Sequence, residues 1–433
     1  MSSYLPSILP LIAWASVILA FLLWYLLKNR SLLAKILLLY FSFCLTFIIL
    51  KLCLPTDLGT YDAKLYQSLA TAISLQLSHD FPGNLPRIFY AYSAYTVPLG
   101  FLYFIFGPSE PLGQLFSTVL GLGVLYNVHR LTLACYHRQA ANLAVLWVAL
   151  YPYGWVIATT LNRDMPIAFF ITLLFRLLAE ALSDCPDHKC GKAAYIKGIA
   201  GVVYLTLLRP PLLVLCGLTL GVSLLIKNRG LFRSLNVFKP LKAILLAVLI
   251  LATFSTIVWN KDRLNGFELT RRALQFTSID NLNLRLESSE DADSAYLPGL
   301  RYGSVKDLIL TLPLATCYFM YSPLPWQVRS PKQALGLIDS ALLLLLTFYF
   351  LKGMPELYRR RRKLALLLLI FVVLGFGSSS LLQCNVGAAM RHRTMFFILM
   401  VPAAAHAFLN PSRRLAAAQS AAPVPCQEPQ GGK

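Results

Sequence analysis

The chain has 433 residues, of which 57% are hydrophobic and 13% charged, and its formal net charge is +20 at pH 7. So few charges exclude a soluble domain with an ionised surface, and apolar stretches long enough to cross a bilayer recur along the sequence. Basic and aromatic residues are not interleaved as in a nucleic-acid module, so the positive charge indicates anionic membrane lipids rather than nucleic acid as partner.

The apolar stretches predict about eleven membrane-spanning helices, because a helix needs roughly 20 apolar residues to cross the hydrocarbon core. Their ranges are 5–27, 32–54, 112–133, 140–158, 166–182, 194–208, 211–226, 241–258, 334–351, 364–381 and 395–409. We therefore expect an all-α polytopic membrane protein with its transmembrane domain in residues 1–409. Residues 410–433, rich in Ala, Pro and Gln, are predicted to be disordered.

Lys and Arg in short connections predict the orientation, because positively charged loops are retained in the cytoplasm during insertion. With eleven spans, all six basic connections fall on one side: 28–30, 129–130 with 137–138, 189–192, 227–233, 359–363 and 413–414. The N-terminus is then outside and the tail is cytoplasmic. Cys185, His188 and Cys190 offer three candidate zinc ligands on the cytoplasmic side, which we interpret as a solvated loop.

The first outside segment, 55–111, contains two predicted surface helices. Asp62 stands at the start of a stretch in which apolar residues recur at every fourth position from Leu65 to Leu77, the pattern of a helix lying in the interface. A second stretch, 91–107, is rich in Tyr and Phe and is interrupted by a proline. It favours a re-entrant or surface helix over a span.

Two tight outside turns carry charge close to the membrane. Arg163 and Asp164 occupy the first turn and Arg209 the second. Charge at this depth is costly unless it is paired or bound, so these residues are candidates for function. Arg176 and Glu180, four residues apart near the inner end of one span, are predicted to pair with each other.

The longest outside segment, 259–331, is polar and contains an acidic patch, 287–293, and the basic residues Arg271, Arg272 and Arg301. An apolar piece within it, 308–321, is too short to span comfortably and contains a proline. We predict that it lies in the outer interface, with Trp326 anchored among the headgroups.

Charged residues of these segments share the predicted outer face with two arginines that lie just ahead of the last predicted span: Asp62, Arg163, Asp164, Arg209, Arg271, Arg272, Arg301, Arg391 and Arg393. Guanidinium groups bind phosphate through two parallel hydrogen bonds, so a lipid phosphate or pyrophosphate is expected there. A carboxylate beside it can act as a general base toward a hydroxyl or hold a divalent cation. This combination indicates transfer chemistry on a lipid-linked donor.

Each of these residues also has a structural interpretation. Asp62 and Asp164 precede helices, where Asp is a favoured N-cap. Arg209 can extend to the headgroups. Arg391 and Arg393 can bind lipid phosphate without specificity.

Several motifs between residues 54 and 409 carry a resemblance: Asp62 ahead of an interfacial helix, Asn162-Arg163-Asp164, the Ser-Pro-Leu-Pro-Trp element at 322–326, and Asn385-Val386-Gly387 followed by Arg391-His392-Arg393. Together they resemble bacterial membrane glycosyltransferases of the GT-C class. More narrowly, the chain is similar to the protein-mannosyltransferase-related members found with exopolysaccharide and cell-envelope genes.

The resemblance implies that residues 1–409 form a catalytic domain in the cell inner membrane, with the active site on the extracytoplasmic side. Its implied partners are a polyprenyl-phosphate-linked sugar, a glycan or lipid acceptor, and membrane lipids. Asp62 matches the catalytic base, although many members have two adjacent carboxylates where this chain has Tyr61-Asp62 and an isolated Asp57.

The second acidic position of the class, linked to metal or acceptor binding, matches Asp164, so a divalent cation, Mg²⁺ or Mn²⁺, is implied. Arg391 and Arg393 match the motif that faces the donor phosphate. The remaining candidates for substrate binding are Tyr66, Arg163, Arg209 and Arg301.

Two other functions are compatible with part of this pattern. A polysaccharide polymerase or O-antigen ligase-like enzyme also holds lipid pyrophosphate with outside arginines but needs no carboxylate in the first loop. A lipid or polysaccharide transporter or flippase would show internal repeats and charges near the membrane midplane. The sequence shows neither of these two features.

Overall fold

The computed structural model describes residues 5–53, 61–79, 93–182, 188–209, 211–227, 279–290, 295–328 and 331–409. Within these ranges the regular structure is helical, apart from one isolated β-bridge between Ala295 and Asn385. The predicted span 241–258, Arg271, Arg272, Cys185 and the predicted tail 410–433 lie outside the described residues.

The described part of the chain contains six helices that are long and apolar enough to cross a membrane. They are α1 (Leu5–Asn29), α2 (Leu32–Cys53), α5 (Glu110–Cys135), α16 (Pro331–Arg360), α17 (Arg362–Ser380) and α18 (Val386–Leu409). A seventh span results if α6 (Arg138–Ala149) and α7 (Pro152–Ala158) are taken together across their 67° bend. Pro152 starts α7 and lacks the amide that would continue α6 through the break.

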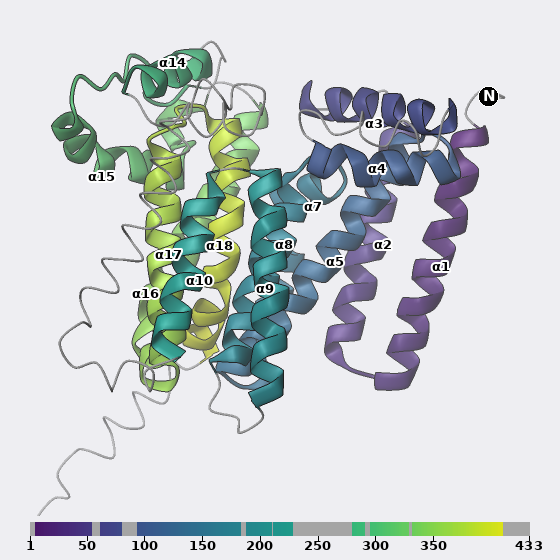
Figure 1. Cartoon of the computed structure of the whole chain (residues 1–433), viewed down its shortest axis with the longest axis horizontal. Helices are drawn as coiled ribbons and strands as arrows, with labels where there is room; N and C mark the ends of the chain where they lie inside the picture. The colour runs from purple at the N-terminus through teal and green to yellow at the C-terminus, as the bar shows by residue number, and fades with distance from the viewer. Residues whose placement is uncertain are drawn as a thin grey trace, which may run out of the picture.

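Three more helices run alongside these in the bundle: α8 (Asp164–Ala181), α9 (His188–Leu208) and α10 (Leu212–Lys227) (Figure 1). The chain is therefore an all-α polytopic membrane protein, and the count of eleven spans stays a prediction. The pairing of Arg176 with Glu180 inside α8 is confirmed, with 3.0 Å between Nε and Oε1.

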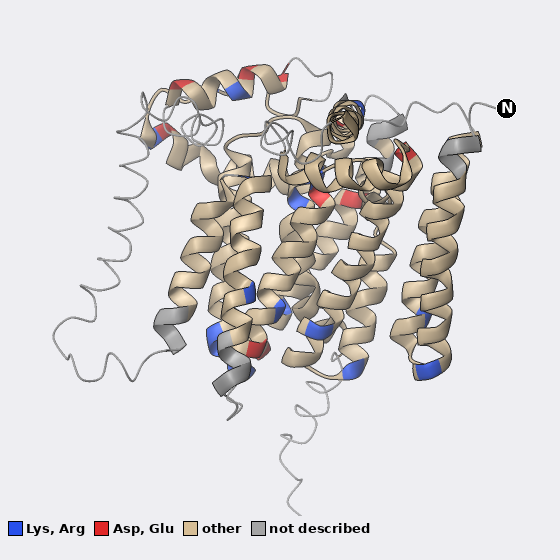
Figure 2. Cartoon of the chain, turned by 45° about the vertical axis from the view of Figure 1, so that its right-hand side comes forward, with Lys and Arg blue, Asp and Glu red and all other residues tan. Residues whose placement is uncertain are grey.

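The two ends of the bundle differ in charge. Figure 2 shows Lys and Arg gathered at the lower end, where helices and loops turn. At the upper end, acidic and basic residues both occur, close to each other along the ribbon. The concentration of basic residues at the lower end matches the charge pattern that the sequence predicted for the cytoplasmic side, and the orientation itself stays a prediction.

Four helices lie at the upper end: α3 (Tyr61–His79), α4 (Ser93–Phe106), α14 (Ile279–Glu290) and α15 (Val305–Tyr321), together with the short 3₁₀ helix Pro325–Gln327. Helices α3 and α4 run across the bundle rather than along it (Figure 1), which is the orientation predicted for them. They pack closely because Gly100 of α4 faces Ile73, where an added Cβ would come within 2.5 Å of Ile73 Cγ2.

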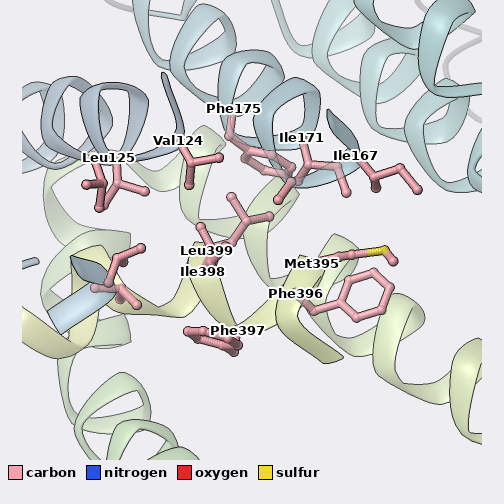
Figure 3. Packing of buried hydrophobic residues seen from close by; sticks show 14 of the residues in the cluster. Val124, Leu125, Ile167, Ile171, Phe175, Met395, Phe396, Phe397, Ile398 and Leu399 are labelled. Carbon is pink, nitrogen blue, oxygen red and sulfur yellow. The ribbon is translucent and has the colours of Figure 1, made fainter. Parts of the chain in front are cut away.

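Helix α18 forms much of the core, and its apolar side chains face those of α5 and α8 (Figure 3). It begins at Val386, nine residues before the predicted span 395–409, because the side-chain oxygen of Asn385 accepts from the amides of Gly387 (2.8 Å) and Ala388 (3.3 Å). The charged triplet at 391–393 therefore lies inside a helix and not ahead of it, which corrects the prediction.

Candidate active site

Arg391 bridges the two carboxylates that the sequence singled out. Its Nε donates to Oδ2 of Asp164 at 2.8 Å, and its Nη1 donates to Oδ2 of Asp62 at 2.7 Å. The three residues come from α18, α8 and α3, with sequence separations of 227 and 329 residues from Arg391. The fold thus brings one guanidinium and two carboxylates together at the upper end of the bundle.

Asp164 lies at the first residue of α8, but it does not cap the helix. The side-chain oxygen of Asn162 accepts from the amides of Asp164 (3.0 Å) and Met165 (3.3 Å), and its amide nitrogen donates to the carbonyl of Ile157 (3.1 Å). Because Asn162 satisfies the helix start, the carboxylate of Asp164 is directed to Arg391. The capping interpretation of Asp164 therefore does not hold.

The two carboxylates differ in their access to solvent. The Asp62 side chain is 37% exposed, whereas that of Asp164 is 3% exposed. A buried carboxylate is costly without a charged partner, so Asp164 and Arg391 depend on each other. Asp62, at the start of α3, is the carboxylate of this pair that a substrate can reach.

Tyr66 lies one turn after Asp62 and is buried against Tyr95, with 5.0 Å between the ring centroids. Burial raises the pKa of Tyr66 to about 12, and the charges of Arg163, Asp62, Asp164 and Arg391 act on it in addition. The phenol therefore stays protonated at neutral pH. Its place on the buried face of α3 makes it part of the packing around the cluster.

Arg163 and Arg209 lie at the edge of the same cluster. Arg163 Nη1 donates to the carbonyl of Leu208 at 3.3 Å, near the end of α9. Arg209 contacts His392 Nε2 and also donates to Met395 Sδ at 3.4 Å. Because guanidinium groups only donate, Nε2 of His392 is the acceptor and its imidazole is neutral. The histidine, for which sequence reasoning gave no role, connects Arg209 to α18.

Arg393 lies elsewhere, although it is only two residues from Arg391. Successive helical residues are about 100° apart, so the two arginines point to nearly opposite sides of α18. Arg393 is fully buried: Nη1 donates to the carbonyls of Met320 (2.8 Å) and Ser322 (2.7 Å), and Nη2 pairs with Asp339. The prediction that Arg393 faces a donor phosphate does not fit this position.

Arg301 is also separate from the cluster. Its Nη1 and Nη2 donate to the two carboxylate oxygens of Glu290 at 2.8 and 3.2 Å. This bond lowers the pKa of the Glu290 carboxyl below its usual value. The pair closes the segment between α14 and α15, so the structure gives Arg301 a local structural contact.

A cavity of about 470 Å³ opens beside Arg391, between α14 and the start of α18. Sequence reasoning missed its α14 wall. Arg285, Ser288 and Ser289 share one face there because they are spaced three and four residues apart. The remaining lining residues are Tyr153, Leu382, Gln383, Asn385, Gly387 and Ala388.

The implied divalent cation does not fit this donor set. Among the described residues there is no group of three or more His, Cys, Asp or Glu side chains that could hold a metal ion. Asp62 and Asp164 instead share a guanidinium placed between them, and that charge would repel a cation.

Comparison with protein-family models, curated proteins and solved structures gave no match. The functional argument therefore rests on the geometry of the cluster formed by Asp62, Asp164 and Arg391, and on the cavity beside it.

Proposed function

We propose that this protein is an integral membrane glycosyltransferase. It transfers a sugar from a polyprenyl-phosphate donor to an envelope or exopolysaccharide acceptor, glycan or lipid, at the outer face of the cell inner membrane. The observation that carries the proposal is the Asp62–Arg391–Asp164 bridge, at the end of the bundle opposite the basic loops and beside a polar cavity.

The proposed chemistry follows from which side chains a substrate in the cavity can contact. Arg391 binds the donor phosphate, and Asp62 accepts the proton of the acceptor hydroxyl. The hydroxyl oxygen bonds to the anomeric carbon as the bond from that carbon to the phosphate oxygen breaks, and the electron pair stays on the lipid phosphate. The guanidinium stabilises this negative charge.

Asp164 serves this reaction as a positioning residue, since its side chain is nearly inaccessible and bonds to Arg391 Nε. Arg163 and Arg209 add positive charge around the cluster, and Tyr66 packs α3 against Tyr95 of α4, one turn after Asp62. A cation is not required in this scheme.

The proposed arrangement has eleven membrane passes, with the N-terminus and the active site outside and the tail in the cytoplasm. Its support is the set of six or seven candidate spans, the shorter apolar helices beside them, and the basic residues at the opposite end. Span 241–258 is needed to keep all the basic loops on one side.

The test is transfer of radiolabelled hexose from polyprenyl-phosphate donors by the full-length protein in vesicles, with an envelope extract as acceptor. Asp62→Asn should reduce the rate by about 100- to 10,000-fold, the range for loss of a general base. Glu287→Gln, which changes an exposed acid on α14, is the matched control. Full activity of Asp62→Asn would remove Asp62 from the mechanism.

A polymerase or ligase acting on lipid pyrophosphate is the second candidate, because the cavity beside Arg391 is lined by a further arginine, Arg285. Such an enzyme needs the arginines and not the first-loop carboxylate. Activity retained by Asp62→Ala but lost in Arg391→Ala would favour it.

A further inference from the structure

Arg391 has one donor nitrogen left for a ligand. Its Nε binds Asp164 and its Nη1 binds Asp62, while Nη2 has no protein partner among the described residues. The side chain is 20% exposed and lines the cavity. The guanidinium therefore presents hydrogen-bonding capacity to that space.

The α14 wall of the cavity is held in place by contacts with the segments around residues 302 and 384. Asn283 of α14 exchanges two hydrogen bonds of 2.9 Å with the backbone of Tyr302, and Cys384 Sγ donates to the carbonyl of Leu286 at 3.4 Å. Leu286, Tyr302 and Cys384 also form a buried apolar cluster. These contacts fix the face of α14 that carries Arg285 against the start of α18.

The lining has the chemistry of an anion site. It contains two arginines, two serine hydroxyls and two side-chain amides, and none of its residues is acidic. The amides of Gly387 and Ala388 are already bonded to Asn385, so the start of α18 contributes its dipole rather than free N–H groups. A phosphate oxygen would meet donors from two sides.

We propose that this cavity binds a phosphate group between Arg285 and Arg391, and that binding withdraws the Arg391 guanidinium from Asp62. The identity of the ligand as a lipid-linked phosphate rests on the proposed function, whereas the anion site and its competition with Asp62 do not.

The competition follows from the shape of the guanidinium. A phosphate bound through two parallel hydrogen bonds occupies the edge formed by Nη1 and Nη2. In the present structure Nη1 donates to Asp62, so a phosphate on this edge competes with that carboxylate. Nε lies outside this edge and can stay bonded to Asp164. Asp164 thus holds the arginine in place while Asp62 is released, and a released carboxylate can accept a proton. Oδ2 of Asp62, which now accepts from Arg391, would become available to an acceptor hydroxyl when the phosphate arrives.

The first experiment measures binding of inorganic pyrophosphate and of farnesyl phosphate to the full-length protein in detergent by calorimetry, with farnesol as the uncharged probe. Arg285→Gln and Arg391→Gln should each weaken phosphate binding by at least about 10-fold. Asp62→Asn should tighten it by about 10-fold, because a neutral amide competes less strongly than a carboxylate for Arg391 Nη1. Arg359→Gln, at the opposite end of the bundle, should bind like the natural protein.

The second experiment follows carbodiimide modification of Asp62 by mass spectrometry. Modification should rise several-fold when pyrophosphate or farnesyl phosphate is added, and it should stay constant in Arg285→Gln. Tighter binding of farnesyl phosphate than of pyrophosphate assigns a lipid-linked ligand, and the reverse assigns free phosphate.

Unchanged affinity in Asp62→Asn, or full phosphate binding by Arg285→Gln, would overturn the inference. Arg285 lies on a helix outside the bundle, so this variant remains informative if Arg391→Gln does not fold. Neither readout requires turnover. If phosphate binding and Asp62 modification change as expected but no sugar is transferred, the proposed function alone is refuted. If sugar is transferred but Asp62 and phosphate do not affect each other, this inference alone is refuted.

Discussion

Two arginines of α18, two residues apart, form ion pairs of opposite character. Arg393 is fully buried and is enclosed by Asp339 and the last carbonyls of α15. Arg391 is partly exposed, is shared by two carboxylates and borders a cavity. We call the buried Arg393–Asp339 contact the closed pair and the partly exposed contacts of Arg391 the open pair. The closed pair fixes how helices pack, whereas the open pair has unused donors with which it can bind a ligand.

The largest effect is expected from opening the closed pair. Arg393→Met leaves Asp339 buried without its partner and should cost about 3–5 kcal/mol of stability. Thermal unfolding in detergent measures this, with the exposed Arg359→Met as control. The double variant Arg393→Met with Asp339→Leu should recover most of the loss, because Arg393 Nε and Asp339 Oδ1 already lack partners. An unchanged unfolding temperature for the single variant contradicts this account.

The open pair should respond in activity rather than in stability. Arg391→Lys keeps a positive charge for Asp164 but loses the planar fork, so sugar transfer should fall by about 100- to 1,000-fold. Its unfolding temperature should stay near that of the natural protein. Equal transfer rates for the lysine variant would show that phosphate is not held through paired hydrogen bonds.

Asp164 tests the role of the open pair, because it is expected to affect catalysis only by holding Arg391 in place. Asp164→Asn should lower kcat by about 10-fold with a smaller change in KM, and the effect should largely vanish in the Arg391→Lys background. Such non-additivity corresponds to a coupling of about 0.5–3 kcal/mol in a double-mutant cycle. Independent, additive losses would mean that Asp164 has a separate role.

A smaller effect is expected at the start of α8. Asn162→Ala removes the side chain that accepts from two amides of the first turn, and loss of a cap costs about 1 kcal/mol. Asn162→Ser retains a capping oxygen and is the control. The unfolding temperature should fall for the alanine variant and recover for serine. Equal unfolding temperatures for the two variants would show that the capping oxygen does not stabilise α8.

The smallest effect is expected at the exposed Arg301–Glu290 pair. The pKa of Glu290 is lowered in the folded protein, so the stabilisation is present at and above its usual value and is lost as pH falls through the lowered one. Exchange of the Gly299 amide, which donates to Glu290 Oε1 at 2.7 Å, should accelerate over that acidic interval beyond its intrinsic pH dependence. Arg301→Gln should abolish the excess acceleration, and its persistence would contradict the assignment.

The sequence allowed the helical class and the placement of Asp62, Asp164 and Arg391 on one face to be predicted, because charge beside a membrane needs partners. It did not predict that Arg391 bridges the two carboxylates. It did not distinguish Arg391 from Arg393, since the helices that face each side of α18 are set by tertiary packing. Arg163 and Asp164 are neighbours in sequence, yet Asp164 pairs with an arginine 227 residues away. The position of Arg285 beside Arg391 could not be predicted, because the polar outside segment has no periodic apolar pattern that shows which side of α14 packs on the bundle.

The distance between Asp164 and its partner along the chain has a consequence for biogenesis. Helix α8 is synthesised long before α18, so the Asp164 carboxylate lacks its Arg391 hydrogen-bond partner until α18 has been made. Packing of α18 against α8 then places the Arg391 guanidinium beside this carboxylate. A polypeptide truncated before α18 would leave the carboxylate of Asp164 without the guanidinium that offsets the cost of its burial.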